Sequence, residues 1–552
     1  MSRWPNSNAT LALTVIGVVA FGVVLPFFWL GIPSGHDFEV HFNAWVEVVD
    51  HWKQGVLYPH WAAMAHYGYG EARFIFYPPI SWKVGAVLGM ILPWKLVPGV
   101  YIWIALALSG TSMFLVAKRW LPRNDALFAA AVYAANPYHL VIVYWRSAMA
   151  ELLAAAYLPL LLLFVLRSDT EEDGPRVVAP LSLLIAAGWL TNVPSAVMMN
   201  YSLALLVLAV AISRRSFSVI AYGSAACVLG AALAAFYLLP VFHQRSWVNL
   251  GQVLAPGVRP EDNFLFTAIA GDPDHYRFNL LVSTIAVWQI VIVAVALFLP
   301  RRLRKQEPWW LLAAWGAMAA VLMTRLTLPL WLHLPQLRYV QLPWRWLLCL
   351  NVPFAVLVAL ATRRWWFRAL VYAAMLAVVL LLWHRVQVPW WDAAADLREM
   401  VDNQHDGPGY EGTDEYVPVA ADPYEIDQQA PRVLFRGTGR AELEVQDWKA
   451  ESRLVIATTS APGKLVFRLF NYPSWRVLVN GHAVVTQTAQ TTGQLMVPVA
   501  AGESRVQITF VEGWDRIVGA AITMVALALA IFWAWRSRRP VPYAPEIRSR
   551  TA

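Results

Sequence analysis

Long apolar runs alternate with short polar segments along most of the chain. A helix needs about 20 apolar residues to cross the hydrocarbon core of a bilayer. Twelve runs reach or approach that length: 11–30, 98–117, 125–145, 148–166, 177–192, 195–212, 218–240, 279–299, 309–324, 345–361, 369–385 and 515–535. A further run at 80–97 is interrupted by Lys83, Pro93 and Lys95, and we interpret it as a juxtamembrane or re-entrant segment. The pattern predicts a polytopic α-helical membrane protein with about 12 transmembrane helices.

The composition agrees with a membrane protein. Hydrophobic residues make up 59% of the 552 residues and charged residues only 14%, whereas soluble domains carry about 25% charged residues. The 29 Trp and 20 Tyr are typical of the aromatic belts that flank a bilayer. We assign the net charge of +8 to cytoplasmic loops. The expected partners therefore include the lipid bilayer and no nucleic acid.

The positive-inside rule orients the predicted spans, because Lys and Arg are enriched in cytoplasmic loops. With the N-terminus inside, the inner segments hold most basic clusters: Lys118/Arg119/Arg123, Arg167/Arg176, Arg214/Arg215, Arg301/Arg302/Arg304/Lys305, Arg363/Arg364/Arg368 and Arg536/Arg538/Arg539. The opposite orientation would place nearly all of them outside. We predict a multi-pass membrane protein with both termini in the cytoplasm. Its large outer segments would be 31–97, 241–278 and 386–514.

Between the last two predicted spans the composition becomes polar and β-prone. Short alternating or β-branched stretches predict strands at 440–445, 453–458, 464–470, 475–479, 495–499 and 504–511. The dipeptide Asn480-Gly481 predicts a tight hairpin. We expect a transmembrane domain at 1–385, an extracytoplasmic β-sandwich domain at 386–514, a final helix at 515–535 and a cytoplasmic basic tail at 536–552.

A polar stretch follows the first predicted span directly, Gly35-His36-Asp37-Phe38-Glu39-Val40-His41. Other polar side chains fall at the outer ends of distant spans, while the helix centres carry almost no charge. An ion-coupled transporter would place ionisable groups near the bilayer midplane. Clustering at one face instead fits a substrate whose tail stays in the lipid. There a carboxylate could act as a general base and arginines could bind a phosphate. The candidate substrate-binding residues are His36, His41, Arg73, Tyr77, Arg146, Glu151, Arg338 and Arg345.

Motifs spread over nearly the whole chain are similar to those of a known family. They are Gly35-His36-Asp37, Tyr67-Gly68-Tyr69-Gly70, Phe76-Tyr77-Pro78-Pro79, Ser147-Ala148-Met149-Ala150-Glu151, Leu337-Arg338-Tyr339-Val340-Gln341-Leu342-Pro343-Trp344-Arg345-Trp346, Gly412-Thr413-Asp414-Glu415-Tyr416 and Asn471-Tyr472-Pro473-Ser474-Trp475. On these residues the chain resembles bacterial membrane proteins described as 6-pyruvoyl-tetrahydropterin synthase-related, and their YfhO-like relatives. More broadly it resembles the glycosyltransferase C (GT-C) superfamily, which uses polyprenyl-phosphate-linked sugars. The pterin label has no support, because the sequence shows no zinc-ligand histidine set.

The resemblance implies a GT-C-like fold and an acidic residue of the first outer loop as the catalytic base or acceptor-orienting group. Asp37 matches that residue, and Glu39 is the competing catalytic candidate. Some superfamily members use a divalent metal, which Asp37 and Glu151 could hold here. The second outer loop has no paired Asp-x-Asp, so we predict neither a metal nor another cofactor.

We therefore expect an enzyme, a membrane glycosyltransferase. It would move a sugar from a polyprenyl-phosphate carrier to a glycan, lipid or protein acceptor at the outer face of the inner membrane. The alternative is a non-catalytic membrane protein of glycan or lipid export or transport. Structural roles also stay open. Asp37 stands at a helix N-cap position, and Arg146 and Glu151 could simply form an ion pair with each other. Residues 414–416 could dock on the membrane part.

Overall fold

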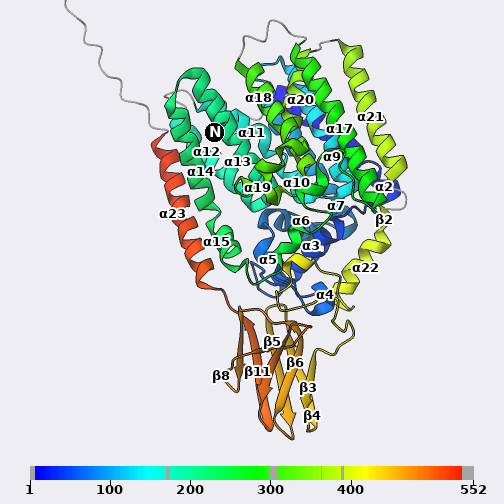
Figure 1. Cartoon of the computed structure of the whole chain (residues 1–552), viewed down its shortest axis with the longest axis vertical. Coiled ribbons are helices and arrows are strands. Elements are labelled where there is room, and N and C mark those ends of the chain that lie inside the picture. Colours follow the sequence, from blue (N-terminus) through cyan, green and yellow to red (C-terminus); the bar gives the residue numbers. More distant parts are fainter. Residues whose placement is uncertain (1–6, 169–173, 299–306, 362–363, 387–390, 538–552) are drawn as a thin grey trace, which may run out of the picture.

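The chain folds into a bundle of apolar helices with a β-sandwich at one end and short helices between them (Figure 1). The structure, a computed structural model, describes residues 7–168, 174–298, 307–361, 364–386 and 391–537. Within these residues, nine helical segments are long and apolar enough to cross a membrane, or up to eleven if each of two bent pairs is one span. The predicted polytopic helical fold is confirmed.

The helices of the bundle follow the predicted apolar runs. They are α1 (Ser7–Val24), α2 (Phe27–Leu30), α7 (Val97–Ala117), α8 (Arg123–Ala134), α9 (Pro137–Val141), the π-helical turn η2 (Ile142–Arg146), α10 (Met149–Ala154), α11 (Tyr157–Arg167), α12 (Gly174–Thr191), α13 (Val193–Arg214), α14 (Phe217–Leu233), α15 (Ala235–Gln244), α17 (Pro273–Phe298), α18 (Glu307–Leu322), η4 (Arg325–Thr327), α19 (Leu328–His333), η6 (Pro343–Trp346), α20 (Leu347–Ala361), α21 (Trp365–Val386) and α23 (Trp514–Arg536). The predicted span 369–385 lies within the 22-residue helix α21. The basic residues predicted at 301–305, at 363 and in most of the tail 536–552 lie outside the described residues.

One predicted span, 218–240, is bent by 71° between α14 and α15. At the bend the Thr523 hydroxyl of α23 accepts a hydrogen bond from the Phe236 amide at 3.1 Å and donates to the Ala232 carbonyl at 3.3 Å. A straight helix would join that amide to that carbonyl directly. A side chain inserted into this ladder kinks a helix.

The β-sandwich consists of two antiparallel sheets, with strand orders β3-β6-β10-β9 and β4-β5-β11-β7-β8. The strands are β3 (Val433–Gly437), β4 (Ala441–Trp448), β5 (Ser452–Thr459), β6 (Gly463–Phe470), β7 (Trp475–Val479), β8 (His482–Ala483), β9 (Gln487–Thr488), β10 (Gln494–Val499) and β11 (Gly502–Phe510). Asn480 and Gly481 join β7 to β8 with φ angles of 50° and 83°, as a two-residue type I′ hairpin requires. The inward side chains of both sheets form one core that includes Val455, Phe467 and Ile508.

The first large loop forms a layer between the bundle and the sandwich (Figure 1). It contains β1 (Ile32–Pro33), α3 (Phe38–Lys53), α4 (Ala65–Gly68), α5 (Arg73–Phe76) and α6 (Pro79–Ile91). The α6 helix covers most of the ambiguous run 80–97, and its 13 residues span only about 20 Å. The remaining short elements are η1 (Trp94–Leu96), η3 (Leu250–Leu254), α16 (Pro260–Asn263), η5 (Leu337–Val340), β2 (Trp391–Asp392), α22 (Ala394–His405) and η7 (Asp414–Tyr416).

A segment far along the chain is fastened to this layer, and we name residues 410–417 the strap. Buried Glu71 accepts hydrogen bonds from the Thr413 amide at 2.7 Å and from Arg73 Nε at 2.5 Å. His66 Nε2 lies 2.9 Å from the same carboxylate. Burial opposes the charge of Glu71, but Arg73 and His66 outweigh it and lower its pKa. The strap is therefore held by an ionised buried carboxylate.

Candidate functional site

The Gly35-His36-Asp37 motif packs against the turn that joins η2 to α10. The Gly35 amide donates to Ser147 Oγ at 3.0 Å, and the Asp37 amide donates to the Arg146 carbonyl at 2.9 Å. A Cβ atom on Gly35 would lie 2.3 Å from the Trp145 carbonyl oxygen. Only glycine allows the two backbones to approach this closely, so this residue sets the position of Asp37.

Replacing Gly35 with alanine is expected to lower the free energy of unfolding by about 1–3 kcal/mol, the usual range for an overpacked site. Thermal unfolding of the purified protein in detergent measures this. Gly251→Ala is the matched control, because no heavy atom lies within 4 Å of its added Cβ. Equal stability of the two variants would contradict the close approach.

Two arginines from distant spans converge on one buried carboxylate beside Asp37. Arg146 Nη1 donates to Glu151 at 2.6 Å, and Arg345 Nε lies 3.1 Å from the same oxygen. Tyr138 donates to the other Glu151 oxygen at 2.6 Å. Arg146 Nη2 also lies 3.7 Å from Asp37 Oδ2, and the Asp37 side chain is 41% exposed. Glu151 thus holds the arginines in place, and Asp37 stays accessible.

These groups line a cavity of about 790 Å³, which we name the large cavity. It lies at the ends of the spans, where Arg146, Glu151 and Arg345 stand near span boundaries. Gln244, at the same end of α15, accepts a hydrogen bond from Tyr472 of the sandwich domain at 2.7 Å. The large cavity therefore faces the sandwich end of the bundle. The predicted site residues that line it are His36, Asp37, His41, Tyr77, Arg146, Glu151 and Arg345.

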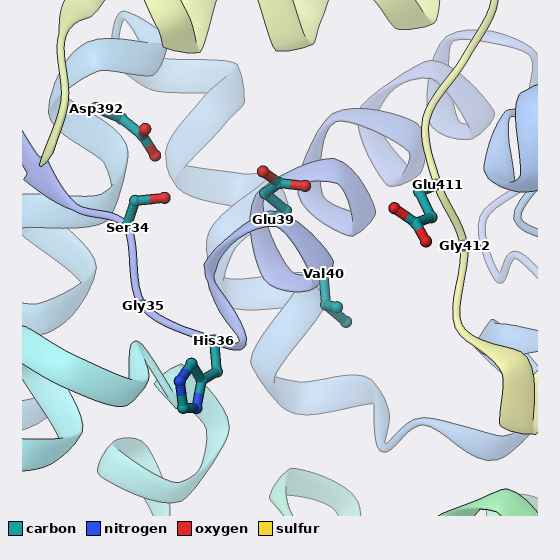
Figure 2. A pocket seen from close by; sticks show the side chains of 8 residues that line it. All are labelled: Ser34, Gly35, His36, Glu39, Val40, Asp392, Glu411 and Gly412. Atoms are coloured by element: carbon teal, nitrogen blue, oxygen red, sulfur yellow. The ribbon is translucent and has the colours of Figure 1, made fainter. Parts of the chain in front are cut away.

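The structure separates the two candidate catalytic carboxylates. Asp37 lines the large cavity, whereas Glu39 lines a smaller cavity of about 450 Å³ with Asp392 and Glu411 (Figure 2). Residues two apart on a helix do not share a face, and Glu39 lies in the first turn of α3. Asp37 occupies the N-cap position of α3, but its side chain makes no capping hydrogen bond. Capping therefore does not account for this carboxylate.

His41 and Tyr77 form a packed wall of the large cavity. Their rings meet edge to face with centroids 5.7 Å apart. Burial lowers the pKa of His41 to about 4, so the imidazole is neutral at pH 7. Burial also raises the pKa of Tyr77. The two side chains offer hydrogen bonds and aromatic surface rather than charge. His36 is exposed, borders both cavities and packs edge to face on Trp145.

Two predicted phosphate-binding arginines lie outside the set that lines the large cavity. Arg73 is buried against Glu71 and donates to the Val40 carbonyl at 3.2 Å. Arg338 is 42% exposed and pairs with Glu261 at 3.2 Å. Both already have protein partners, so the structure brings only Arg146 and Arg345 of the predicted arginines to the large cavity.

Further lining residues come from segments that the predicted site set does not include. Arg245 reaches the large cavity from beyond α15, and its guanidinium lies 4.3 Å from the Phe242 ring centroid. Thr413, Glu415 and Tyr416 reach it from the strap. For the strap residues, one signal was present in the sequence, the polar Gly412-Thr413-Asp414-Glu415-Tyr416 motif. In the described part of the chain, no group of three or more His, Cys, Asp or Glu side chains is placed to hold a metal ion.

The fold and the site define a polytopic membrane protein whose polar cavity lies at a membrane interface, beneath a β-sandwich. Residues 74–388 match the membrane-protein family described as the 6-pyruvoyl-tetrahydropterin synthase related domain. This match covers more than half of the chain, and the chain belongs to that family. The resemblance seen in the sequence motifs is thereby confirmed. The comparison with curated proteins gave no match.

Three solved structures are similar in fold. ArnT from Cupriavidus metallidurans bound to undecaprenyl phosphate has a TM-score of 0.44 and 14% sequence identity, over 72% of this chain and 70% of ArnT. The apo oligosaccharyltransferase of Archaeoglobus fulgidus has a TM-score of 0.37 and 14% sequence identity, over 73% of this chain and 56% of the oligosaccharyltransferase chain. AglB of Archaeoglobus fulgidus, in complex with an inhibitory peptide and a dolichol-phosphate, has a TM-score of 0.37 and 13% sequence identity. The match covers 74% of this chain and 57% of AglB.

Proposed function

We propose that the protein is a GT-C-type glycosyltransferase that moves a sugar from a polyprenyl-phosphate carrier to an acceptor at the outer face of a bacterial inner membrane. The observation that carries this proposal is the meeting of an accessible carboxylate, Asp37, with two arginines in a cavity at the ends of the spans. That combination provides a base and an anion site side by side.

The arginine pair suits the phosphate of the carrier. Each guanidinium has five N–H donors in a planar fork. Arg345 Nη1 donates to the Val340 carbonyl and to the Gln341 side chain, and Arg345 Nε lies 3.1 Å from Glu151. The remaining donors can bind phosphate oxygens through charge-assisted hydrogen bonds. Arg245 adds a third cation to the lining. The polyprenyl phosphate would be the leaving group. The arginines would stabilise its negative charge.

The same cavity has an apolar wall for a lipid tail. Side chains from the α12–α13 turn and from α15 line it, including Trp189, Val193, Leu238, Val241 and Phe242. Two of these helices expose apolar side chains elsewhere along their length, Leu183 of α12 and Leu208 of α13, as helices that face lipid would. A carrier could therefore keep its tail near the bilayer while its head group meets the arginines.

Asp37 would act as the general base. It would take the proton from the attacking hydroxyl of the acceptor while the new bond to the anomeric carbon of the sugar forms. The bond from that carbon to the phosphate oxygen breaks in the same step. Attack from the side opposite the phosphate inverts the anomeric centre. General-base catalysis of this kind contributes about 10²–10⁴-fold to a rate.

Binding of undecaprenyl phosphate to the purified protein tests the anion site. Arg345→Met is expected to weaken it roughly 10- to 100-fold, because hydrogen bonds to charged groups contribute about 1.5–3 kcal/mol. Arg338→Met is the matched control and is expected to bind within about twofold of wild type, since Arg338 does not line the cavity. Equal loss in both variants would point to general electrostatics and contradict the assignment.

Transfer itself is tested by mass spectrometry of envelope glycans in a strain that lacks the gene and in the same strain supplied with it. A glycan that disappears and returns supports transfer. Binding of the carrier without any change in glycans would instead favour a non-catalytic export protein.

A further inference from the structure

The strap closes one wall of the large cavity and is fixed there by main-chain hydrogen bonds. The Tyr410 amide donates to the Met64 carbonyl at 3.1 Å, and the Tyr416 carbonyl accepts from Ala72 at 3.2 Å. At its far end the Val417 carbonyl accepts from the Asn249 amide at 2.9 Å. Together with the bond from Thr413 to Glu71, these contacts hold the strap between two outer segments that are distant in sequence.

Two carboxylates of the strap face different cavities. Glu415 lines the large cavity with Thr413 and Tyr416, whereas Glu411 lines the smaller one. Glu411 is exposed and Glu415 is partly buried. They have the same chemistry and lie four residues apart, so they form a matched pair for substitution.

Each of the three carboxylates that line the large cavity has a different environment. Glu151 is fully engaged by two arginines and a tyrosine. Asp37 lies beside Arg146. Glu415 belongs to the sandwich side of the cavity, and burial raises its pKa to about 7. A carboxylate oxygen of Glu415 can accept a hydrogen bond from a hydroxyl group.

Aromatic rings line the same cavity as Glu415. The Tyr416 ring stacks on Phe76 with centroids 6.2 Å apart and an interplanar angle of 8°. Tyr77 and Tyr237 line the same cavity. An aromatic surface with one carboxyl group suits a sugar ring, which has apolar C–H faces and a hydroxyl edge. Pockets of this kind orient a ligand through a few polar groups on an apolar wall.

We propose that Glu415 binds a hydroxyl-bearing glycan acceptor in the large cavity, by accepting a hydrogen bond from an acceptor hydroxyl other than the reacting one. This inference rests on the proposed function. No bond forms or breaks at Glu415, and Asp37 still removes the reacting proton. The strap lies beyond residues 74–388, which the family match covers.

The test compares Glu415→Gln with Glu411→Gln in two measurements. One is binding of undecaprenyl phosphate to each purified protein. The other is the amount of the gene-dependent envelope glycan in the deletion strain supplied with each variant. We expect both variants to bind the carrier within about twofold of wild type. Glu415→Gln keeps an acceptor oxygen but loses the negative charge, so it should reduce the glycan roughly 10-fold, while Glu411→Gln should restore it fully. Glu415→Asp, which keeps the charge, should recover part of the loss.

The outcomes distinguish failure of the role of Glu415 from failure of the proposed glycosyltransferase function. Equal glycan levels in the Glu415→Gln and Glu411→Gln strains would overturn the role of Glu415 alone. Loss of carrier binding in Glu415→Gln would also overturn it, because the residue would then belong to the phosphate site or to the fold. If wild type and the deletion strain have the same glycans, the proposed function fails, and this inference fails with it.

Discussion

Sugar transfer by Asp37→Asn is expected to fall by about 100- to 10,000-fold, the range that a general base contributes. Asparagine keeps the shape of the side chain but cannot accept the proton. Because Asp37 makes no capping hydrogen bond and is 41% exposed, the variant should keep its stability and its affinity for undecaprenyl phosphate. The measurements are gene-dependent glycan formation, thermal unfolding and carrier binding.

Glu39→Gln is the control for this prediction. The residue lies two positions from Asp37 but lines the smaller cavity, so its glycan formation should stay near the wild-type level. If Glu39→Gln loses glycan formation while Asp37→Asn retains it, Glu39 rather than Asp37 is the general base. Activity in both variants would falsify the assignment of either carboxylate as the base.

Glu151→Gln is expected to be the most destabilising of the proposed substitutions. It leaves Arg146 and Arg345 buried, 3% and 8% exposed, without their shared counter-ion. Breaking a buried ion pair by removing one partner typically costs about 3–5 kcal/mol. The free energy of unfolding in detergent should fall by that amount. Carrier binding should weaken as well, because Glu151 positions both guanidinium groups.

Glu261→Gln provides the comparison for Glu151→Gln. Glu261 also pairs with an arginine, Arg338, but both side chains are partly exposed, at 26% and 42%. Exposed pairs contribute at most about 1 kcal/mol. A stability loss in Glu151→Gln no larger than in Glu261→Gln would mean that the buried cluster is not held by its charges.

Hydrophobic periodicity was enough to predict the bundle and most of the sandwich. Every predicted apolar run contains a helix, and the six predicted strands correspond to β4, β5, β6, β7, β10 and β11. The short strands β8 and β9 have two residues each, too few for an alternation to be seen. The bend between α14 and α15 depends on Thr523, almost 300 residues away. A local pattern contains no information about such a contact.

The site was predictable in kind but not in detail. The sequence placed the Asp37, Arg146, Glu151 and Arg345 side chains at span ends, and the structure brings them together. It grouped Asp37 with Glu39, which helix geometry then separates. Glu71 could not be predicted, since nothing local marks a carboxylate that is buried by a segment 342 residues later. Arg73 is a partner of that carboxylate rather than a lining residue.

The contact between Glu71 and the strap also has a consequence for biogenesis. The Thr413 amide is made 342 residues after Glu71, and a nascent chain grows at roughly 5–20 residues per second. Arg73 and His66 can contact the Glu71 carboxylate as soon as this segment is made. The strap cannot contact it until roughly 17–70 seconds later. The contacts of Glu71 therefore cannot be completed until Thr413 has been synthesised. A chain truncated before the strap would lack these contacts. The segment around Glu71 would stay incompletely folded and exposed to the cell's membrane proteases.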